Sequence, residues 1–359
     1  MDWQIIGILT QDGVTSGAVY ALLALALVLV FSVTRVIFIP QGEFVSFGAL
    51  TLAGMQSGAM PQITLLLMAM GAAVFLLEAA DVFRRAAKGE RGNEVNGASP
   101  GARTWLLLAL KYLAFPAALH AICRIVPLAS LPAALQAALA ILIVTPMGPM
   151  LYRIAYQRLS EATTLVLLIV SVAAHLVLTG VGLLVFGAEG SRTRPFSELS
   201  LDLGGVPVSG QVLSVIAISL LLIVALYLYF DRSLSGKALR ATAVNRVGAR
   251  LVGVGTNQAG KLAFTLAAAI GALSGVLIGP MTTVFYDSGF LIGLKGFVGA
   301  IVGGLVSYPL AAAGAVLVGL LESYSSFWAS AFKEVIVFTL IIPVLLWRSL
   351  TSRHADDEH

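Results

Sequence analysis

Long apolar stretches without a charged residue alternate with short polar segments along the chain. About 20 apolar residues suffice to cross the hydrocarbon core of a bilayer as a helix that satisfies its own backbone hydrogen bonds. Stretches of this length cover residues 13–34, 44–77, 125–152, 162–188, 203–230, 262–286 and 296–321, and a shorter one ends at Trp347.

Two of these regions need separate treatment. A turn at residues 58–61, which contains Pro61, divides the second stretch into two spans, and segment 105–124 is a weaker span because it contains Lys111 and His120. The pattern predicts an all-α polytopic membrane protein with about 8 to 11 transmembrane or re-entrant helices. We expect residues 1–359 to form a single membrane-spanning domain.

Basic residues are concentrated in four polar regions. They are Arg84, Arg85, Lys88, Arg91 and Arg103 in the first region, Arg153 and Arg158 in the second, Arg232, Lys237, Arg240, Arg246, Arg250 and Lys261 in the third, and Arg348 and Arg353 in the fourth. Because cytoplasmic loops carry an excess of Lys and Arg, all four should be cytoplasmic. This places the N-terminus outside, the C-terminus in the cytoplasm, and segment 189–202 outside. Residues 81–104 would then be a disordered polar cytoplasmic linker, residues 231–258 a cytoplasmic loop, and residues 349–359 a cytoplasmic tail.

Composition supports a lipid environment. Of 359 residues, 58% are hydrophobic and only 11% are charged, with a formal net charge of +4, whereas soluble domains carry about 25% charged residues. The positive charge therefore reflects basic loops and not nucleic-acid binding. A single cysteine, Cys123, excludes a disulfide framework or a cysteine metal cluster within one chain.

The segment Gly255-Thr-Asn-Gln-Ala-Gly260-Lys261-Leu262 resembles a phosphate-binding loop until its last residue. Such a loop requires a buried strand before it and a Ser or Thr after the lysine, but Leu262 occupies that position. No other motif for enzyme catalysis, and no metal-ligand spacing, is present. We expect a chain with no enzymatic activity, no ATPase site, no metal and no cofactor.

Polar residues at membrane depth are costly and need a reason. Glu43 follows Pro40, Gln41 and Gly42, which should break a helix, and a helix restarting near Glu43 would point its N-terminus at a substrate carboxylate. The alternative is that Glu43 lies at an interface and pairs with Arg35. His175 has no second ligand at helical spacing and is interpreted as a packing residue.

Glycines recur at four-residue spacing in two apolar stretches. Gly271, Gly275 and Gly279 form one series, and Gly299 and Gly303 form another. Small residues at this spacing allow close helix packing in lipid. Lining of a narrow path is the other interpretation, and we assign it to Gly299 and Gly303.

The third basic region contains a short amphipathic pattern. Ala243, Val247, Leu251 and Val254 are spaced by three and four residues, which predicts a short helix whose apolar face needs a partner surface or lipid headgroups.

This region also carries a family resemblance. Its pattern is similar to the coupling region of the LivH-type permease subunit of ATP-binding-cassette importers for branched-chain amino acids, through Gly236, Ala238, Arg240, Ala241, Ala243, Asn245, Ala249, Leu251, Gly253 and Val254. Residues 16–37 resemble the first span of that family, residues 41–44 its "HGE" element, and residues 293–323 its glycine-rich C-terminal region. Gln41 replaces the family's histidine, and residues 77–127 look inserted.

The resemblance implies a division of labour between subunits. Residues 243–254 would form a coupling helix on a separate ATPase, with Arg240, Ala243, Asn245, Ala249, Leu251 and Gly253 as coupling residues. The implied partners are a second permease of the same type, two ATPase subunits, a solute-binding protein and the lipid of the bacterial inner membrane. We assign the substrate pathway to Tyr20, Gln41, Gly42, Glu43, Gly299 and Gly303, and helix packing to Gly271, Gly275 and Gly279.

Two alternatives remain open. Some relatives carry urea or short amides, and Gln41 in place of histidine leaves the cargo undecided. A secondary transporter working alone, with Glu43 as the ion-coupling carboxylate, is the rival mechanism, and it predicts paired broken helices in inverted repeats.

Overall fold

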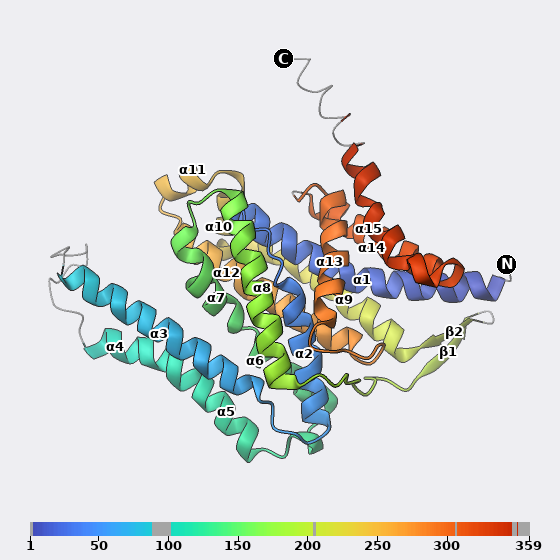
Figure 1. The fold of residues 1–359 in the computed structure, drawn as a ribbon, viewed down its shortest axis with the longest axis horizontal. Helices are drawn as coiled ribbons and strands as arrows, with labels where there is room; N and C mark the ends of the chain where they lie inside the picture. The colour runs from blue at the N-terminus through green and yellow to red at the C-terminus, as the bar shows by residue number, and fades with distance from the viewer. Residues whose placement is uncertain (1–2, 88–101, 204–205, 306, 347–349, 351–359) are drawn as a thin grey trace.

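The computed structural model describes residues 3–87, 102–203, 206–305, 307–346 and 350. Figure 1 shows a bundle of tilted helices with one small hairpin. The elements, in chain order, are α1 (Trp3–Thr34), α2 (Gln41–Gln56), α3 (Ile63–Ala87), α4 (Ala102–Ala109), η1 (Leu110–Ala114), α5 (Phe115–Ile125), η2 (Leu128–Ser130), α6 (Ala133–Val144), α7 (Met147–Leu151), η3 (Tyr152–Tyr156), η4 (Gln157–Leu159), α8 (Thr164–Phe186), β1 (Ser200–Leu203), β2 (Val206–Ser209), α9 (Gly210–Arg232), α10 (Leu234–Val244), α11 (Arg246–Leu251), α12 (Thr256–Ile278), α13 (Ser288–Val302), α14 (Tyr308–Trp328), η5 (Ser330–Phe332) and α15 (Lys333–Thr339).

Eight helical segments of the described chain are long and apolar enough to cross a membrane, and α13 is a shorter apolar helix. The predicted all-α polytopic fold is thereby confirmed. The exception is the antiparallel hairpin β1–β2, which directly precedes α9 and takes up the start of the predicted apolar stretch 203–230. The predicted turn at residues 58–61 also lies where expected, because α2 ends at Gln56, Gly58 has a positive φ of 79°, and α3 begins at Ile63.

Helix α1 lies at the centre of the bundle. In its most apolar window 78% of the residues are buried, and it packs along α14, α12 and α13. Helix α2 is short and almost wholly buried between α12 and α13. In the break between α1 and α2, Arg35 is exposed, whereas Val36, Phe38 and Pro40 are buried.

Glycines permit the close approach of α12 to α2. A Cβ atom on Gly275 would collide with the carbonyl oxygen of Val45, and one on Gly271 would press on the Phe44 side chain at 2.8 Å. Gly279 differs from the other two, because it caps the C-terminus of α12 and lies against Thr193 in a loop.

The boundaries of two predicted segments are wrong. Residues 296–321 form two helices, α13 and α14, since the chain turns at Gly304 and Leu305, both with positive φ, and Pro309 then begins α14. Residues 81–87 continue helix α3 and are not part of an irregular linker. Residues 102–104 of the predicted linker begin α4. Residues 88–101 and the tail, apart from Leu350, lie outside the described residues.

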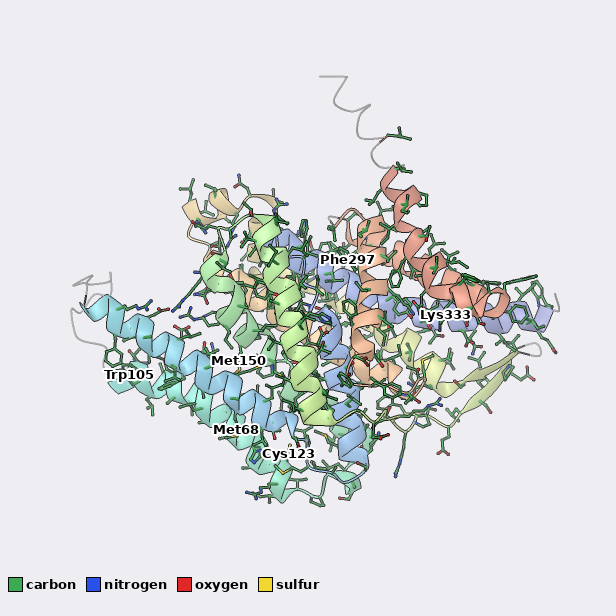
Figure 2. All side chains as sticks on the ribbon, viewed as in Figure 1. Met68, Trp105, Cys123, Met150, Phe297 and Lys333 are labelled. Carbon is green, nitrogen blue, oxygen red and sulfur yellow. The ribbon has the colours of Figure 1, made fainter. Side chains whose placement is uncertain are left out.

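Helices α3, α4 and α5 form an arm that extends from the bundle at the left of Figure 1. The segment Arg103–Ile125 is continuous, with a π-helical turn at η1, so the weakest of the predicted spans is a helix. Trp105 packs on Phe83 at 5.5 Å, and Thr64 contacts His120 Nδ1 at 2.9 Å near the other end. Figure 2 labels Met68 and Trp105 on this arm.

Ion pairs connect segments from three of the basic regions at one end of the molecule. Arg158 pairs with Asp81 of α3 at 3.1 Å, Arg250 with Glu161 at 3.0 Å, and Lys261 with Glu78 at 3.5 Å. The start of α1, which is predicted to be outside, contacts β2 shortly after the predicted outside segment 189–202, because Gly7 lies against Val206. The basic segments therefore lie together, and so do the start of α1 and β2. The side of the membrane that each of these two groups faces stays a prediction.

Candidate functional site

The helix break before Glu43 lies inside the protein. Helix α2 begins at Gln41, directly after Pro40, as predicted from the sequence. Gln41 is 1% exposed, and its Nε2 donates a hydrogen bond to the carbonyl oxygen of Ala267 in α12 at 2.9 Å. The oxygen Oε1 of Gln41 is buried and has no hydrogen-bond partner among the described residues.

Glu43 is buried against α8. Its Oε1 lies 2.5 Å from His175 Nδ1, and Thr179 Oγ1 lies 3.5 Å from the same carboxylate oxygen. The His175 ring stacks on Phe290 of α13, with 4.2 Å between centroids. The expected pairing of Glu43 with Arg35 is wrong, because Glu43 is 2% exposed and Arg35 lies over the Phe31 ring. His175 is therefore more than a packing residue.

Gly42 is a contact residue. A Cβ atom at this position would overlap the carbonyl oxygen of Gly289 and approach the Cα of Phe290 at 3.0 Å, so the backbones of α2 and α13 touch here. Gly42 therefore faces α13, and its assignment to the substrate pathway stays a prediction.

Gln41 lines a small cavity of about 180 Å³. The other lining residues are apolar or glycine: Leu27, Ile37, Phe38, Ile39, Leu168, Gly293, Leu294 and Phe297. Gln41 is consequently the only polar side chain in this lining. The site combines one amide with an aliphatic and aromatic wall, which suits a small ligand that is mostly apolar.

A second polar cluster joins α1, α13, α14 and the start of α15. Lys295 Nζ lies 2.5 Å from Glu322 Oε1 and 3.1 Å from Glu334 Oε1, and Tyr20 Oη donates to Glu322 Oε2 at 2.6 Å. The Lys295 side chain is 7% exposed. We refer to Tyr20, Lys295, Glu322 and Glu334 as the buried charge cluster. The sequence analysis selected only Tyr20, since Lys295 and Glu322 are isolated charges in the sequence and Glu334, next to Lys333, reads as a residue at the membrane boundary.

Gly299 and Gly303 are also contact residues. A Cβ atom on Gly299 would meet the Cα of Ala315 at 2.7 Å, and one on Gly303 would meet the backbone nitrogen of Ala311 at 2.6 Å. Both glycines thus lie against α14, and their assignment to the lining of a pathway stays a prediction.

The predicted coupling helix over residues 243–254 is wrong. Helix α10 ends at Val244, and Asn245 adopts an extended conformation with φ −149° and ψ 102°. Its Oδ1 accepts a hydrogen bond from the backbone N–H of Gly248 at 2.8 Å, which caps the separate helix α11. An Asn side chain competes with the backbone in this way, so it ends one helix and begins another.

The helix pair α10–α11 exposes aliphatic side chains. Val244, Val247, Leu251 and Val252 are between 68% and 87% exposed, and we call these four residues the coupling surface. Ala249 is buried, while Ala243 and Val254 are half-buried, so only Val247 and Leu251 of the predicted apolar face are free. Arg240 pairs with exposed Asp231 at 3.8 Å, and Gly253 has a positive φ of 85° after α11.

Polar contacts fix α11 to the body of the protein. Arg246 Nη1 donates to the carbonyl oxygen of Ser160 at 2.7 Å, and Arg250 reaches Glu161 at 3.0 Å and Thr256 Oγ1 at 3.1 Å. Ser160 and Glu161 shortly precede α8, and Thr256 begins α12. A force applied to α11 is therefore passed to two long helices.

The resemblance to a phosphate-binding loop is not matched by the local structure. Gly255 precedes α12, and residues 256–261 form its first turns, with Lys261 paired to Glu78. The element directly before this segment is helix α11, and not the buried strand that a phosphate-binding loop requires. Among those residues there is also no group of three or more His, Cys, Asp or Glu side chains that could hold a metal ion.

Comparison with known proteins agrees with this architecture. Residues 100–345 match the family model described as "Branched-chain amino acid transport system / permease component". The chain belongs to this family. The match begins inside residues 77–127, the segment predicted to be inserted. Membership and the eight spans together make the chain a multi-pass permease of the cytoplasmic (inner) membrane.

Three relatives illustrate the similarity. The high-affinity branched-chain amino acid transport system permease protein BraD of Pseudomonas aeruginosa is 30% identical over 233 residues, which cover 61% of this chain and 74% of BraD. The permease protein LivH of Escherichia coli, of the same description, is 31% identical over 217 residues, covering 58% and 70%. A probable branched-chain amino acid transport permease protein LivH of Methanocaldococcus jannaschii is 28% identical over 177 residues, covering 48% and 56%. No solved structure matches the chain.

Proposed function

We propose that this chain is the transmembrane subunit of an ATP-binding-cassette importer for branched-chain or related amino acids, driven by separate ATPase subunits through α10–α11. The observation that carries the proposal is the coupling surface. Its four aliphatic side chains are largely exposed next to a basic segment that we place in the cytoplasm, away from the hydrocarbon core. An exposed apolar patch of this kind is typical of a protein–protein contact.

The anchoring of α11 supports a mechanical role. Because Arg246 and Arg250 tie it to the start of α8 and to α12, movement of a bound ATPase would shift helices that border Glu43 and Gln41. The extended conformation of Asn245 divides the contact region into two short helices, α10 and α11, in place of one straight helix.

The cargo is inferred from two observations. The relatives are described as branched-chain amino acid permeases, and the cavity beside Gln41 has an aliphatic and aromatic lining. A branched aliphatic side chain would lie against that lining, and a polar end group would bond to the buried Gln41 amide. A second permease subunit, two ATPases and a solute-binding protein complete the proposed complex.

The proposal is tested with Val247→Glu and Leu251→Glu, alone and together. A carboxylate at the centre of an apolar contact should reduce co-purification of the ATPase subunits by at least about tenfold, because burial of an unpaired charge costs several kcal/mol. ATP-dependent uptake should fall by the same factor. Both positions are exposed, so the permease should still insert and fold, which a monodisperse elution profile would confirm.

Leu199→Glu provides the matched control. Leu199 is 73% exposed but precedes the hairpin β1–β2, far along the chain from α11. ATPase co-purification should be unchanged by this variant. Full ATPase binding and full uptake by the Val247→Glu, Leu251→Glu double variant would refute the proposed coupling surface.

The Glu43–His175 pair favours a second candidate, the ion-coupled transporter that works alone. In that case, the chain reconstituted by itself in liposomes would accumulate solute when a proton or sodium gradient is imposed, and Glu43→Gln would abolish the accumulation. Under the importer proposal, the chain alone accumulates nothing, and the collapse of ion gradients leaves ATP-driven uptake intact.

A further inference from the structure

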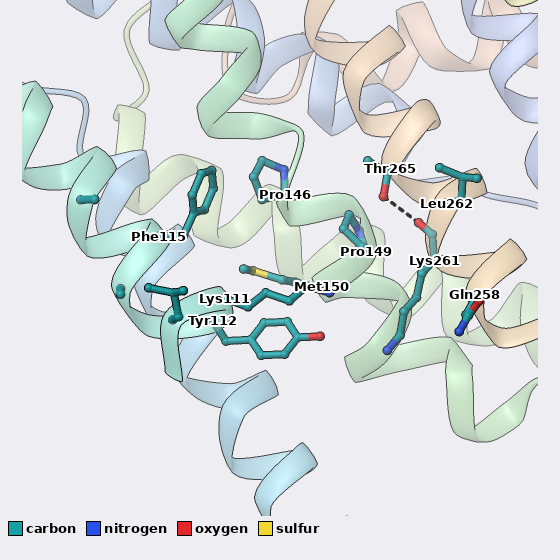
Figure 3. Close-up of a pocket in the computed structure, with 13 residues that line it drawn as sticks. Lys111, Tyr112, Phe115, Pro146, Pro149, Met150, Gln258, Lys261, Leu262 and Thr265 are labelled. Carbon is teal, nitrogen blue, oxygen red and sulfur yellow. Dashed lines mark hydrogen bonds between the residues drawn. The ribbon is translucent and has the colours of Figure 1, made fainter. Parts of the chain in front are cut away.

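A groove separates the arm from the bundle. It has a volume of about 1060 Å³ and lies between the segment Arg103–Ile125 on one side and α7 and α12 on the other. Figure 3 shows Phe115 on the arm facing Pro146, Pro149 and Met150 across the groove. The groove exceeds the range of roughly 300–1,000 Å³ that is usual for small-molecule sites, so it is larger than an amino acid requires.

The groove opens at membrane depth. Both of its walls belong to segments that are apolar and long enough to span the bilayer, Arg103–Ile125 and Thr256–Ile278. Within the arm, the segment Arg103–Ile125 packs on α3. At this depth, the part of the groove lined by Phe115, Met150 and Leu262 would face hydrocarbon and not water. An acyl chain is therefore the favoured occupant.

Two lysines enter the groove from opposite walls. Lys111 extends from η1 and Lys261 from the second turn of α12, and Gln258 lies one turn before Lys261 (Figure 3). Lys111 lies over the Tyr112 ring at 5.3 Å and has no carboxylate within ion-pair distance among the described residues. Two cations that face the same apolar groove favour an anionic group between them.

The local carboxylates do not neutralise these cations. Glu78 accepts from Arg153 at 2.8 Å as well as from Lys261 at 3.5 Å, and Asp81 is shared by Arg153 and Arg158. Two carboxylates thus face three paired cations, and Lys111 adds a fourth. This end of the groove carries a positive surplus, at the end of the protein where the basic segments meet and anionic lipids of the cytoplasmic leaflet would lie.

We propose that this groove binds an anionic glycerophospholipid, with its phosphate between Lys111 and Lys261 and an acyl chain along Phe115, Met150 and Leu262. Basic pockets between transmembrane helices on the cytoplasmic side are suited to such headgroups. The lipid would fill the space between arm and bundle and tie the two together. The proposal is independent of the transported solute and of the ATPase contact.

The experiment uses the full-length chain purified in detergent. It is titrated with phosphatidylglycerol and, separately, with phosphatidylcholine of the same acyl chains, and bound lipid is counted by native mass spectrometry. Phosphatidylglycerol should bind at one tight site, with at least tenfold preference over phosphatidylcholine. The Lys111→Gln, Lys261→Gln double variant should lose about 25-fold in phosphatidylglycerol affinity, since each basic residue near an anionic surface contributes about fivefold.

Two further variants separate the groove from general charge effects. Arg124→Gln removes an exposed cation near the far end of the same helical segment, 13 residues from Lys111, which corresponds to about 20 Å along a helix; it should leave binding unchanged. Ala118→Trp leaves both lysines in place but fills the groove, and it should displace either lipid.

A photoreactive acyl chain on phosphatidylglycerol should label Phe115, Met150 or Leu262. Equal binding of the two lipids with no effect of the double lysine variant would overturn the proposal. So would labelling confined to the outer faces of α8 and α9, because the lipid would then be annular and not bound in the groove.

Discussion

Helices α1 and α8 are equally hydrophobic but occupy opposite kinds of position. Both have a mean hydropathy of 2.4 in their most apolar window, yet 78% of that window is buried in α1 and only 22% in α8. In water, such a difference would reflect hydrophobicity. In lipid, hydrophobicity does not explain the difference in burial, because the lipid chains are as apolar as the protein interior. Burial depends there on packing between helices.

Residue size and polarity distinguish the two regions. Around α1 and α2, glycines such as Gly13, Gly17 and Gly275 bring backbones into direct contact. Helix α8 instead presents large side chains outward, including Leu165, Leu176 and Leu184, and a Cβ atom on its Gly180 would meet nothing within 4 Å. We therefore expect the inner helices to tolerate few substitutions by larger side chains, and the outer face of α8 to tolerate many.

The largest effect is expected in the buried charge cluster. Lys295→Met leaves Glu322 and Glu334 without their shared cation, and breaking a buried ion pair in this way costs about 3–5 kcal/mol. The midpoint of thermal unfolding in detergent should fall strongly. Arg240→Met, which breaks the exposed pair with Asp231, should leave that midpoint unchanged.

A compensated variant sharpens this prediction. Adding Glu322→Gln and Glu334→Gln to Lys295→Met removes the unpaired charges and should recover much of the lost stability, because neutral replacement of a whole buried ion pair is often tolerated. An unfolding midpoint for Lys295→Met equal to that of the unmodified chain would show that the cluster contributes nothing to stability.

An intermediate effect is expected from a single methyl group. Gly275→Ala places a Cβ atom against the Val45 carbonyl oxygen and should destabilise the protein by about 1–3 kcal/mol, since α2 and α12 must separate. Gly180→Ala makes the same chemical change on the open face of α8 and serves as the control. Equal unfolding midpoints for the two variants would mean that the α2–α12 contact is looser than described.

The smallest effect is expected at the bend between α10 and α11. Asn245→Ala removes the cap of α11 and should cost about 1 kcal/mol, confined to that helix. Amide hydrogen exchange at Gly248 should accelerate about fivefold while the global unfolding midpoint is unchanged. Asn257→Ala, at an exposed position in the first turn of α12, is the control. Unchanged exchange at Gly248 would show that α11 does not depend on its cap.

Several features of the candidate site could be predicted because they are local in sequence. Pro40 and Gly42 mark the break before α2, and the four-residue spacing of Gly271 and Gly275 marks a close helix contact. The helix boundary at Asn245 could also have been predicted from the sequence, because Asn is a preferred N-cap residue. The boundary was missed because the spacing of Ala243, Val247, Leu251 and Val254 predicted one continuous helix.

The polar partners could not be predicted. Glu43 and His175 are 132 residues apart, and Lys295 meets Glu322 and Glu334 from three different elements. Nothing in the neighbouring residues indicates which of several isolated charges will pair. The groove between arm and bundle is likewise formed by three separate segments of the sequence, within residues 110–118, 146–150 and 258–265.

The sequence by itself determined that this chain is a multi-pass membrane protein of the permease family, with a basic amphipathic segment between its spans. It could do so because hydrophobic length, charge clustering and motif spacing are properties of contiguous residues. Only the tertiary structure decided which equally apolar helix lies at the centre, which charges neutralise one another, and which aliphatic side chains remain exposed. Those outcomes depend on backbone approach and side-chain pairing across long separations, and in lipid hydrophobicity does not select among them.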